Sequence, residues 1–66
     1  MKFTLEMTTD NAAFHEADGE DTGVAMNAET ARILRSLAAR LENDETRGRL
    51  IDANGNVVGQ FCYYIS

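Results

Sequence analysis

Apolar and polar residues alternate at the start of the chain. Phe3, Leu5 and Met7 are separated by single polar residues. This period of two predicts a strand over residues 2–8 that buries one face. The β-branched threonines between them suit the outer face of such a strand.

Residues 9–27 show no sustained period, and Gly19 and Gly23 stand among acidic residues. This composition predicts a long acidic loop. Within it, residues 12–14 can form a short turn that brings Phe14 against the core. A connection of this length is uncommon in a small domain, and it is either functional or a solvated surface loop.

The following segment has the period of an amphipathic helix. We expect the helix to begin at Asn27, a good N-cap, and to end at Asn43 and Asp44, which favour turns. The predicted core-facing stripe consists of Thr30, Leu34, Leu37, Ala38 and Leu41, widened by Ala31 and Ile33. The residues predicted to point away from it are Glu29, Arg32, Ser36, Ala39 and Arg40. Glu29 also suits the helix dipole in the first turn.

Residues 46–51 and 57–65 are predicted to be two strands, and they flank a turn that contains Asn54 and Gly55. An Asn-Gly pair between apolar runs is a strong hairpin signal, because both residues tolerate a positive φ. The pattern leaves open whether Ile51 pairs with the first or the second residue of the later run.

The last strand is the most apolar, so we place it at the centre of the sheet, with the first strand on its other side. The expected architecture is a single α+β domain over residues 1–66, in the order β-α-β-β. It has a three-stranded antiparallel sheet with one helix packed on one face. The residues of the last strand assigned to the core face are Val57, Gly59, Phe61, Tyr63 and Ile65.

Cys62 and Tyr64 then lie on the face that a single helix leaves open. Exposed aromatic surface of this kind often marks an interface. We therefore expect self-association as a homodimer formed face to face or edge to edge. The features that favour it are Cys62, Tyr64 and the exposed edge of residues 47–51.

The negative charge of the chain is concentrated in one segment. The acidic residues there, with no Lys or Arg among them, are Asp10, Glu16, Asp18, Glu20 and Asp21. The chain has a net charge of -5, and the remaining acidic residues equal the 6 Lys and Arg in number. A focused charge attracts a cationic partner more effectively than a dispersed one, so we expect these five residues to bind a protein with a basic surface. The acidic balance argues against direct binding of nucleic acid.

The chain offers few groups for catalysis or for a metal. Cys62 is its only cysteine and His15 its only histidine, so neither a zinc site nor a nucleophile–base pair has support. Residues 52–56 match the opening of a calcium-binding EF-hand loop. However, Val57 stands in place of the sharp-turn glycine and Tyr63 in place of the bidentate glutamate. We expect a protein that is not an enzyme and has no metal or cofactor.

Four arginines are the candidates for a basic surface: Arg32, Arg40, Arg47 and Arg49. The first two lie on the helix and the last two on one strand face, so we do not expect them to converge. Ordinary surface ion pairs account for them better. A nucleic-acid accessory role through these arginines is the weakest alternative.

No stretch approaches the roughly 20 apolar residues of a membrane span. The N-terminus lacks the apolar run of a signal peptide, and a single cysteine fits a reducing compartment. The expected location is the cytoplasm.

The chain contains five short motifs in the order Lys2–Glu6, Asp10–Phe14, Ala31–Ala38, Gly48–Leu50 and Asp52–Gly59. This order resembles a group of small, functionally uncharacterised proteins encoded by bacteriophages and prophages. The likeness covers nearly the whole chain except residues 16–26, where this sequence is longer and more acidic. The resemblance implies a phage or prophage origin, and it carries over no catalytic residue.

Small acidic proteins from such sources often occupy a host protein, and anti-CRISPR proteins are one such class. The resemblance and the acidic segment together suggest a phage-derived inhibitor, most sharply an anti-CRISPR protein that blocks the nucleic-acid-binding surface of a CRISPR effector. Surfaces built from Lys and Arg for phosphate also attract carboxylates. The alternative is a self-associating phage structural or assembly module.

Overall fold

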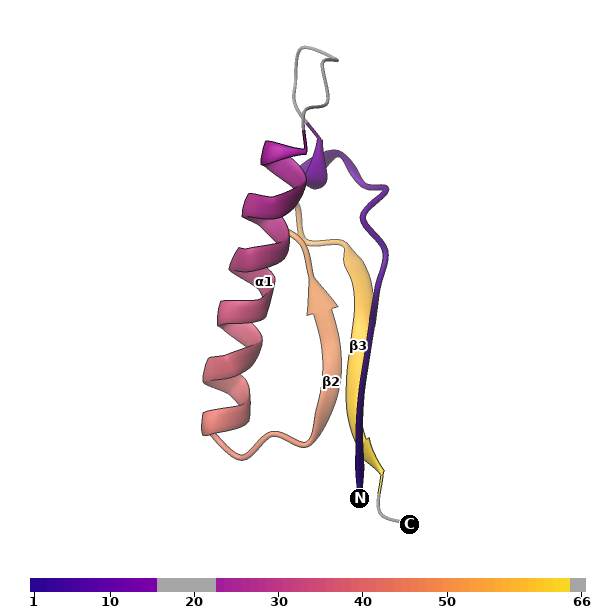
Figure 1. The fold of residues 1–66 in the computed structure, drawn as a ribbon, viewed down its shortest axis with the longest axis vertical. Coiled ribbons are helices and arrows are strands. Elements are labelled where there is room, and N and C mark those ends of the chain that lie inside the picture. The colour runs from indigo at the N-terminus through magenta and orange to yellow at the C-terminus, as the bar shows by residue number, and fades with distance from the viewer. Residues whose placement is uncertain (16–22, 65–66) are drawn as a thin grey trace.

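The computed structural model describes residues 1–15 and 23–64. Within these ranges the elements are β1 (Lys2–Met7), the 3-10 helix η1 (Ala12–Phe14), α1 (Val24–Glu42), β2 (Arg47–Ile51) and β3 (Val57–Tyr64). The strands form an antiparallel sheet in the order β1-β3-β2, and α1 packs against one face of it (Figure 1). The predicted α+β architecture is confirmed.

β3 is the central strand, as the sequence predicts. Its Phe61 lies opposite Leu5 of β1 and opposite Gly48 of β2. Residues paired in this way project from the same side of a sheet, and Phe61 belongs to the core beneath α1. The alternate residues Cys62 and Tyr64 therefore project from the opposite side, as predicted.

A β-bulge decides which residues of β3 face the core. Ile51 pairs with Val57, and the register shift lies between Leu50 and Ile51. Val58 has no partner on β2 and is buried, whereas Val57 is 54% exposed. The predicted core face is therefore right for Phe61 and wrong for Val57, because the bulge reverses the alternation between them.

The far end of the predicted core face is also more open than expected. Tyr63 is partly exposed, and its ring lies 4.8 Å from the ring of Phe3 on β1. Ile65 lies outside the described residues.

The turn between β2 and β3 is organised by Asp52. One of its carboxylate oxygens accepts hydrogen bonds from the backbone N–H groups of Asn54 and Asn56, both at 2.9 Å. Within residues 52–56 only Gly55 has a positive φ, at 84°. The turn therefore lies where the Asn-Gly pair predicts it. The Asp52 side chain and the positive φ of Gly55 shape the turn. Asn54 does not adopt the positive φ that the prediction allowed for it.

α1 begins earlier than predicted. Its N-cap is Gly23, which has a φ of 85°, and the first helical residue is Val24. The backbone N–H of Asn27 already donates to the carbonyl of Gly23 at 3.0 Å, so Asn27 lies within the helix and is not its N-cap. The other end is as predicted: Asn43 caps the helix, and Asp44 adopts a φ of 68°.

The buried face of α1 is rotated from the predicted one. Ile33 and Leu37 are buried, whereas Leu34, assigned to the core, is 44% exposed. Glu29 and Arg40 were expected to point away from the sheet, yet Glu29 is only 7% exposed and Arg40 reaches toward β2. Both polar side chains find partners on the sheet side, which makes this orientation of the helix possible.

The core contains few large residues. Its buried hydrophobic members are Phe14, Ile33, Leu37, Leu50, Val58 and Phe61. Phe14 is completely buried, and its N–H donates to the carbonyl of Asn11 at 3.0 Å to close the η1 turn. The prediction that a short turn tucks Phe14 against the core is confirmed.

Candidate functional site

The acidic residues singled out by the sequence lie only partly within the described structure. Asp10 follows β1 and is exposed. The other four, Glu16, Asp18, Glu20 and Asp21, lie outside the described ranges 1–15 and 23–64.

The two flanks of this segment are held at one end of the molecule. On the N-terminal side, η1 packs against α1 through the buried side chain of Phe14. On the C-terminal side, Gly23 caps the first turn of α1. Both flanks lie at the end of the molecule opposite the chain termini (Figure 1). Residues 16–22 are therefore attached to the fold at two neighbouring, anchored points.

A polar network supports this end of the fold. The carboxylate of Glu29 accepts two hydrogen bonds from the Arg32 guanidinium, at 2.7 and 3.0 Å, and one from the N–H of Ala53 at 2.7 Å. Asp52 accepts a further bond from the side-chain amide of Asn11 at 3.1 Å. The network thus connects the start of η1, the second turn of α1 and the β2–β3 turn.

The two carboxylates of this network carry lowered pKa values. The Arg32 guanidinium, helped by the Ala53 N–H, holds the pKa of Glu29 below its usual range despite burial. Hydrogen bonds from the backbone of Asn56, and then from the Asn11 side chain, lower the pKa of Asp52. The carboxylate oxygens of Glu29 and Asp52 accept hydrogen bonds from donors of the same chain. These two carboxylates therefore maintain the fold and are poor candidates for a ligand site.

Sequence reasoning missed this network. Asp52 was interpreted only as part of a turn, although an aspartate followed by further polar turn residues is typical of a side chain that caps its own turn. Glu29 carried no such signal, because its partners Ala53 and Arg32 become informative only once the hairpin lies beside α1.

The arginines do not form a common basic surface. Arg32 and Arg40 are ion-paired with Glu29 and Glu45, at 2.7 and 3.0 Å. The predicted ion pairs are confirmed for these two residues. Arg47 and Arg49 project from the open face of β2, opposite Cys62 and Gln60 of β3. The expectation that the two pairs do not converge is confirmed.

The outer edge of β2 is covered by α1. The guanidinium of Arg40 donates to the carbonyl of Arg49 at 2.6 Å and lies 4.9 Å from the centre of the Phe61 ring. Farther along the strand, Arg32 donates to the carbonyl of Ile51 at 3.2 Å. The edge of residues 47–51 was expected to be exposed; instead, helix side chains occupy two of its carbonyls.

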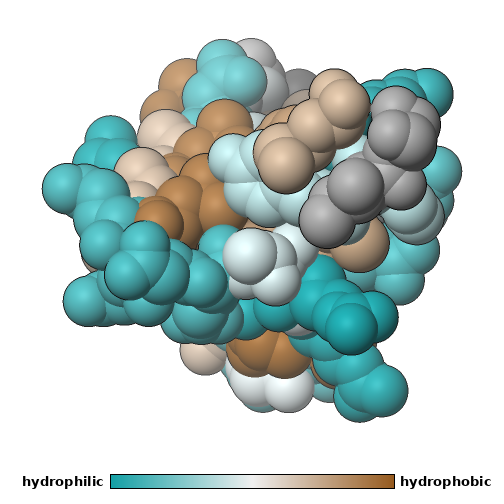
Figure 2. All heavy atoms as spheres, turned by 90° about the horizontal axis from the view of Figure 1, so that it is seen from below, coloured by the Kyte–Doolittle hydropathy of each residue, from teal (hydrophilic) through white to brown (hydrophobic). Residues whose placement is uncertain are grey.

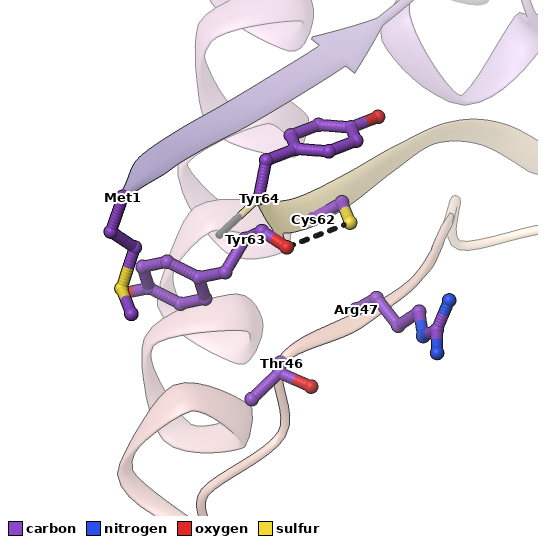
Figure 3. Close-up of a pocket in the computed structure, with 6 residues that line it drawn as sticks. All are labelled: Met1, Thr46, Arg47, Cys62, Tyr63 and Tyr64. Atoms are coloured by element: carbon purple, nitrogen blue, oxygen red, sulfur yellow. Dashed lines mark hydrogen bonds between the residues drawn. The ribbon is translucent and has the colours of Figure 1, made fainter. Parts of the chain in front are cut away.

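A hollow of about 530 Å³ lies at the opposite end of the molecule, near the termini (Figure 3). The residues that line it are Met1, Thr46, Arg47, Cys62, Tyr63 and Tyr64. The structure thus brings Cys62 and Tyr64, the predicted self-association residues, to one surface. Figure 2 shows the molecule from this end, where apolar atoms reach the surface among hydrophilic ones. Met1 is 80% exposed and Phe3 is 40% exposed.

The hollow offers binding surface but little chemistry. The Cys62 thiol donates to the carbonyl of Tyr63 at 3.3 Å, and the cationic side chain of the lining is that of Arg47. Within residues 1–15 and 23–64, no group of three or more His, Cys, Asp or Glu side chains could hold a metal ion. No helix in the same ranges is long and apolar enough to cross a membrane.

Comparisons with protein-family models, with curated proteins and with solved structures found no match. Charge and geometry are therefore the observations that bear on function.

Proposed function

We propose that the protein is a non-enzymatic binding protein of phage or prophage origin that attaches to a basic surface of a host protein in the host cytoplasm. The observation that carries this proposal is the position of the charge. The net charge of -5 equals that of Asp10 together with the four acidic residues between 16 and 21, because the acidic and basic residues elsewhere cancel. A basic partner is attracted to such a segment over distances of about one Debye length.

The described structure supports this proposal in two ways. The described residues that flank the segment are anchored by the buried side chain of Phe14 and by Gly23, the N-cap of α1, and Asp10 on the N-terminal side is exposed. Elsewhere, Arg32 and Arg40 are paired with carboxylates of the same chain and do not offset the acidic segment.

The sharpest form of the proposal is an anti-CRISPR protein. A CRISPR effector holds nucleic acid in a channel lined with Lys and Arg. Carboxylates presented by the acidic segment compete with phosphates for those side chains. Binding of this kind prevents the effector from engaging its target without any chemical step.

The test is displacement of labelled DNA from a purified multi-subunit CRISPR effector. The segment variant is Asp18→Asn with Glu20→Gln. The matched control is Asp44→Asn with Glu42→Gln, which changes the charge equally at exposed positions near the end of α1. We expect the segment variant to displace DNA about tenfold less effectively and the control to resemble the wild type. Displacement by the wild type should weaken as salt shortens the Debye length from about 10 Å to about 3 Å.

Equal losses in the two variants would show that net charge matters and the segment does not. Binding that salt leaves unchanged would contradict the electrostatic mechanism.

A second candidate function is a self-associating phage assembly module. The observation in its favour is the hollow near the termini, where Cys62 and Tyr64 lie beside the exposed side chain of Met1. Assemblies larger than a dimer in sedimentation, lost on Tyr64→Ser, would favour this function. A protein that forms no such assemblies would exclude it.

A further inference from the structure

The two edges of the sheet differ in how they are covered. The β2 edge accepts hydrogen bonds from Arg32 and Arg40, as described above. In the described residues, β1 pairs only with β3. An uncovered edge strand is a template for another strand.

The backbone groups at the β1 edge follow from the alternation of the ladder. The N–H of Thr8 donates to the carbonyl of Val58 at 2.8 Å, so the even-numbered residues of this segment direct their backbone groups toward β3. The N–H and C=O groups of Phe3, Leu5 and Met7 therefore point outward. Three consecutive sets of donors and acceptors are available for pairing.

We propose that this edge binds the β1 edge of a second copy of the chain. The two strands run antiparallel about a two-fold axis through Thr4, and together the two sheets form one six-stranded sheet. This dimer is independent of the proposed inhibitor function and does not involve the β2 edge. Of the residues that line the hollow, it involves Met1.

The side chains of β1 are self-complementary in this register. Lys2 of each copy lies opposite Glu6 of the other, so the dimer contains two equivalent Lys2–Glu6 ion pairs. Phe3 lies opposite Leu5 of the other copy, and Thr4 lies opposite its own counterpart. Opposite charges and paired apolar residues stabilise neighbouring strands, whereas like charges destabilise them.

The register also satisfies the backbone. Phe3 and Leu5, whose backbone groups point outward, meet each other as a hydrogen-bonded pair. Thr4 meets Thr4 as a non-hydrogen-bonded pair. A two-fold axis at Leu5 would also pair odd-numbered residues, whose backbone groups point outward. However, it places Lys2 opposite Thr8 and Glu6 opposite Thr4. No ion pair forms there, so charge selects the axis at Thr4.

The surroundings of β1 leave room for a second copy. α1 packs against β2, on the side of the sheet away from the β1 edge (Figure 1). In the dimer both helices lie on the same face of the joined sheet. The exposed side chains of Met1 and Phe3 are then covered by Met7 and Leu5 of the other copy.

The experiment is sedimentation equilibrium over a concentration series up to about 1 mM, a range that includes weak specific association. We expect the wild type to approach twice the 7.3 kDa mass of the chain. Lys2→Glu and Glu6→Lys should each raise the dimer Kd about tenfold or more, because two attractive pairs become repulsive. The combined swap, Lys2→Glu with Glu6→Lys, should restore the wild-type Kd. Arg35→Glu makes the same charge change as Lys2→Glu on the exposed side of α1 and should have no effect.

Disulfide trapping tests the register directly. Thr4 also lies opposite Cys62 of its own chain, so the variant is Thr4→Cys with Cys62→Ser. We expect oxidation to give a covalent dimer, because the Cβ atoms of non-hydrogen-bonded pairs are close enough for a disulfide. Glu6→Cys in the same background is the control and should cross-link poorly, since it faces residue 2.

A wild-type chain that remains monomeric throughout the series would overturn the proposal. So would a charge swap that fails to rescue the single variants, or equal cross-linking of the two cysteine variants. Circular dichroism spectra that match the wild type would show that the variants are folded. A wild-type chain that forms the dimer but does not displace DNA would refute the proposed function alone.

Discussion

Asp52 shows how much of this small fold depends on a single side chain. It is only 3% exposed and accepts hydrogen bonds from Asn11, Asn54 and Asn56. Backbone N–H groups at a tight turn must find acceptors when water is excluded. The carboxylate therefore replaces water for a turn that also supports η1.

The lowered pKa values of Asp52 and Glu29 predict a loss of stability in acid. A carboxyl group whose folded-state pKa lies below its unfolded value stabilises the fold above that unfolded value. The contribution is lost as the pH falls through the folded pKa. The ordinary values are 3.8 for Asp52 and 4.5 for Glu29, so the loss should begin below about pH 5 and continue past them.

Urea unfolding of wild type and Asp52→Asn, followed at a series of pH values, measures this effect. The variant should be less stable near neutral pH, and the difference should shrink in acid, where the wild-type carboxyl is also protonated. Asp44→Asn, the same substitution at an exposed residue, is the control. A difference that is constant with pH would show that the charge of Asp52 contributes nothing.

Gly59 is required for the close approach of β1 to β3. A Cβ atom at this position would meet the carbonyl oxygen of Glu6 and would lie 2.8 Å from the Cα of Met7. Both are backbone atoms and cannot move without separating the strands. Gly59→Ala should therefore cost about 1–3 kcal/mol in the free energy of unfolding, measured with urea.

Gly48 provides the comparison. A Cβ there would meet the end of the Arg40 side chain and lie 3.2 Å from Cε1 of the Phe61 ring, which are side-chain rather than backbone atoms. Gly48→Ala should cost less than Gly59→Ala and about 1 kcal/mol, because Arg40 can shift with partial loss of its contacts, whereas the backbone of β1 cannot. Equal costs at the two glycines would contradict the account given for Gly59.

At the scale of elements, α1 is joined to the sheet by arginines as well as by apolar packing. Arg40 stacks on Phe61, donates to the carbonyl of Arg49 and pairs with Glu45. Its charged end reaches the β2 edge. One side chain thus joins the last turns of α1 to the sheet and occupies the carbonyl of Arg49, which another strand would otherwise use.

Arg40→Ala should lower the free energy of unfolding by about 1–2 kcal/mol, from the loss of the cation–π contact and the hydrogen bond to a carbonyl. Arg35→Ala, on the exposed side of the same helix, should change it by less than about 0.5 kcal/mol. Urea unfolding of both variants gives the comparison. Similar losses would mean that Arg40 acts only through its helical propensity.

For the whole molecule, the attachment of the acidic segment and the chain termini mark two different ends. The acidic segment is attached beside η1, whereas Met1 and Phe3 lie near the termini (Figure 1). In the proposed dimer the two β1 strands are antiparallel, so the two η1 turns lie at opposite ends of the assembly. Each dimer then carries two acidic segments, which raises the apparent affinity when two partner sites are within reach.

The dimer makes stability depend on concentration. An assembly that forms only from folded chains stabilises the folded state by mass action. Above the dimer Kd, each tenfold increase in wild-type concentration should raise the Tm by about 3 °C or more, and the Tm of Lys2→Glu should change less. Thermal unfolding followed by circular dichroism at several concentrations measures this. Parallel behaviour of the two proteins would argue against the β1 pairing.

Some features of the fold and of the candidate surfaces could be predicted because they depend on residues near in sequence. The alternation around Phe3 and Leu5 predicts β1, and Asn43 with Asp44 predicts the end of α1. The turn at Asn54 and Gly55 is located correctly for the same reason. Alternation also predicts that Tyr64 is exposed, which the structure confirms.

Other features could not be predicted because they depend on contacts between distant segments. The bulge at Val58 arises where β3 must match β1 on one side and β2 on the other. The rotation of α1 requires partners for Glu29 and Arg40, which come from the hairpin that follows. A helical pattern records which residues are apolar, but it does not record which polar residues will find partners on the buried side.

The strand–helix–hairpin order could be predicted from the sequence, as could the central position of β3 and the concentration of negative charge between Asp10 and Asp21. These follow from local periodicity, turn chemistry and composition. Only the tertiary structure decided which carboxylates are internal, which residues of β3 face the core and which sheet edge is open. The physical reason is that hydrogen-bond partners and strand edges are defined by neighbours in space. The same Arg32 and Arg40 that the sequence places on an outer face close one edge, and β1 remains available at the other.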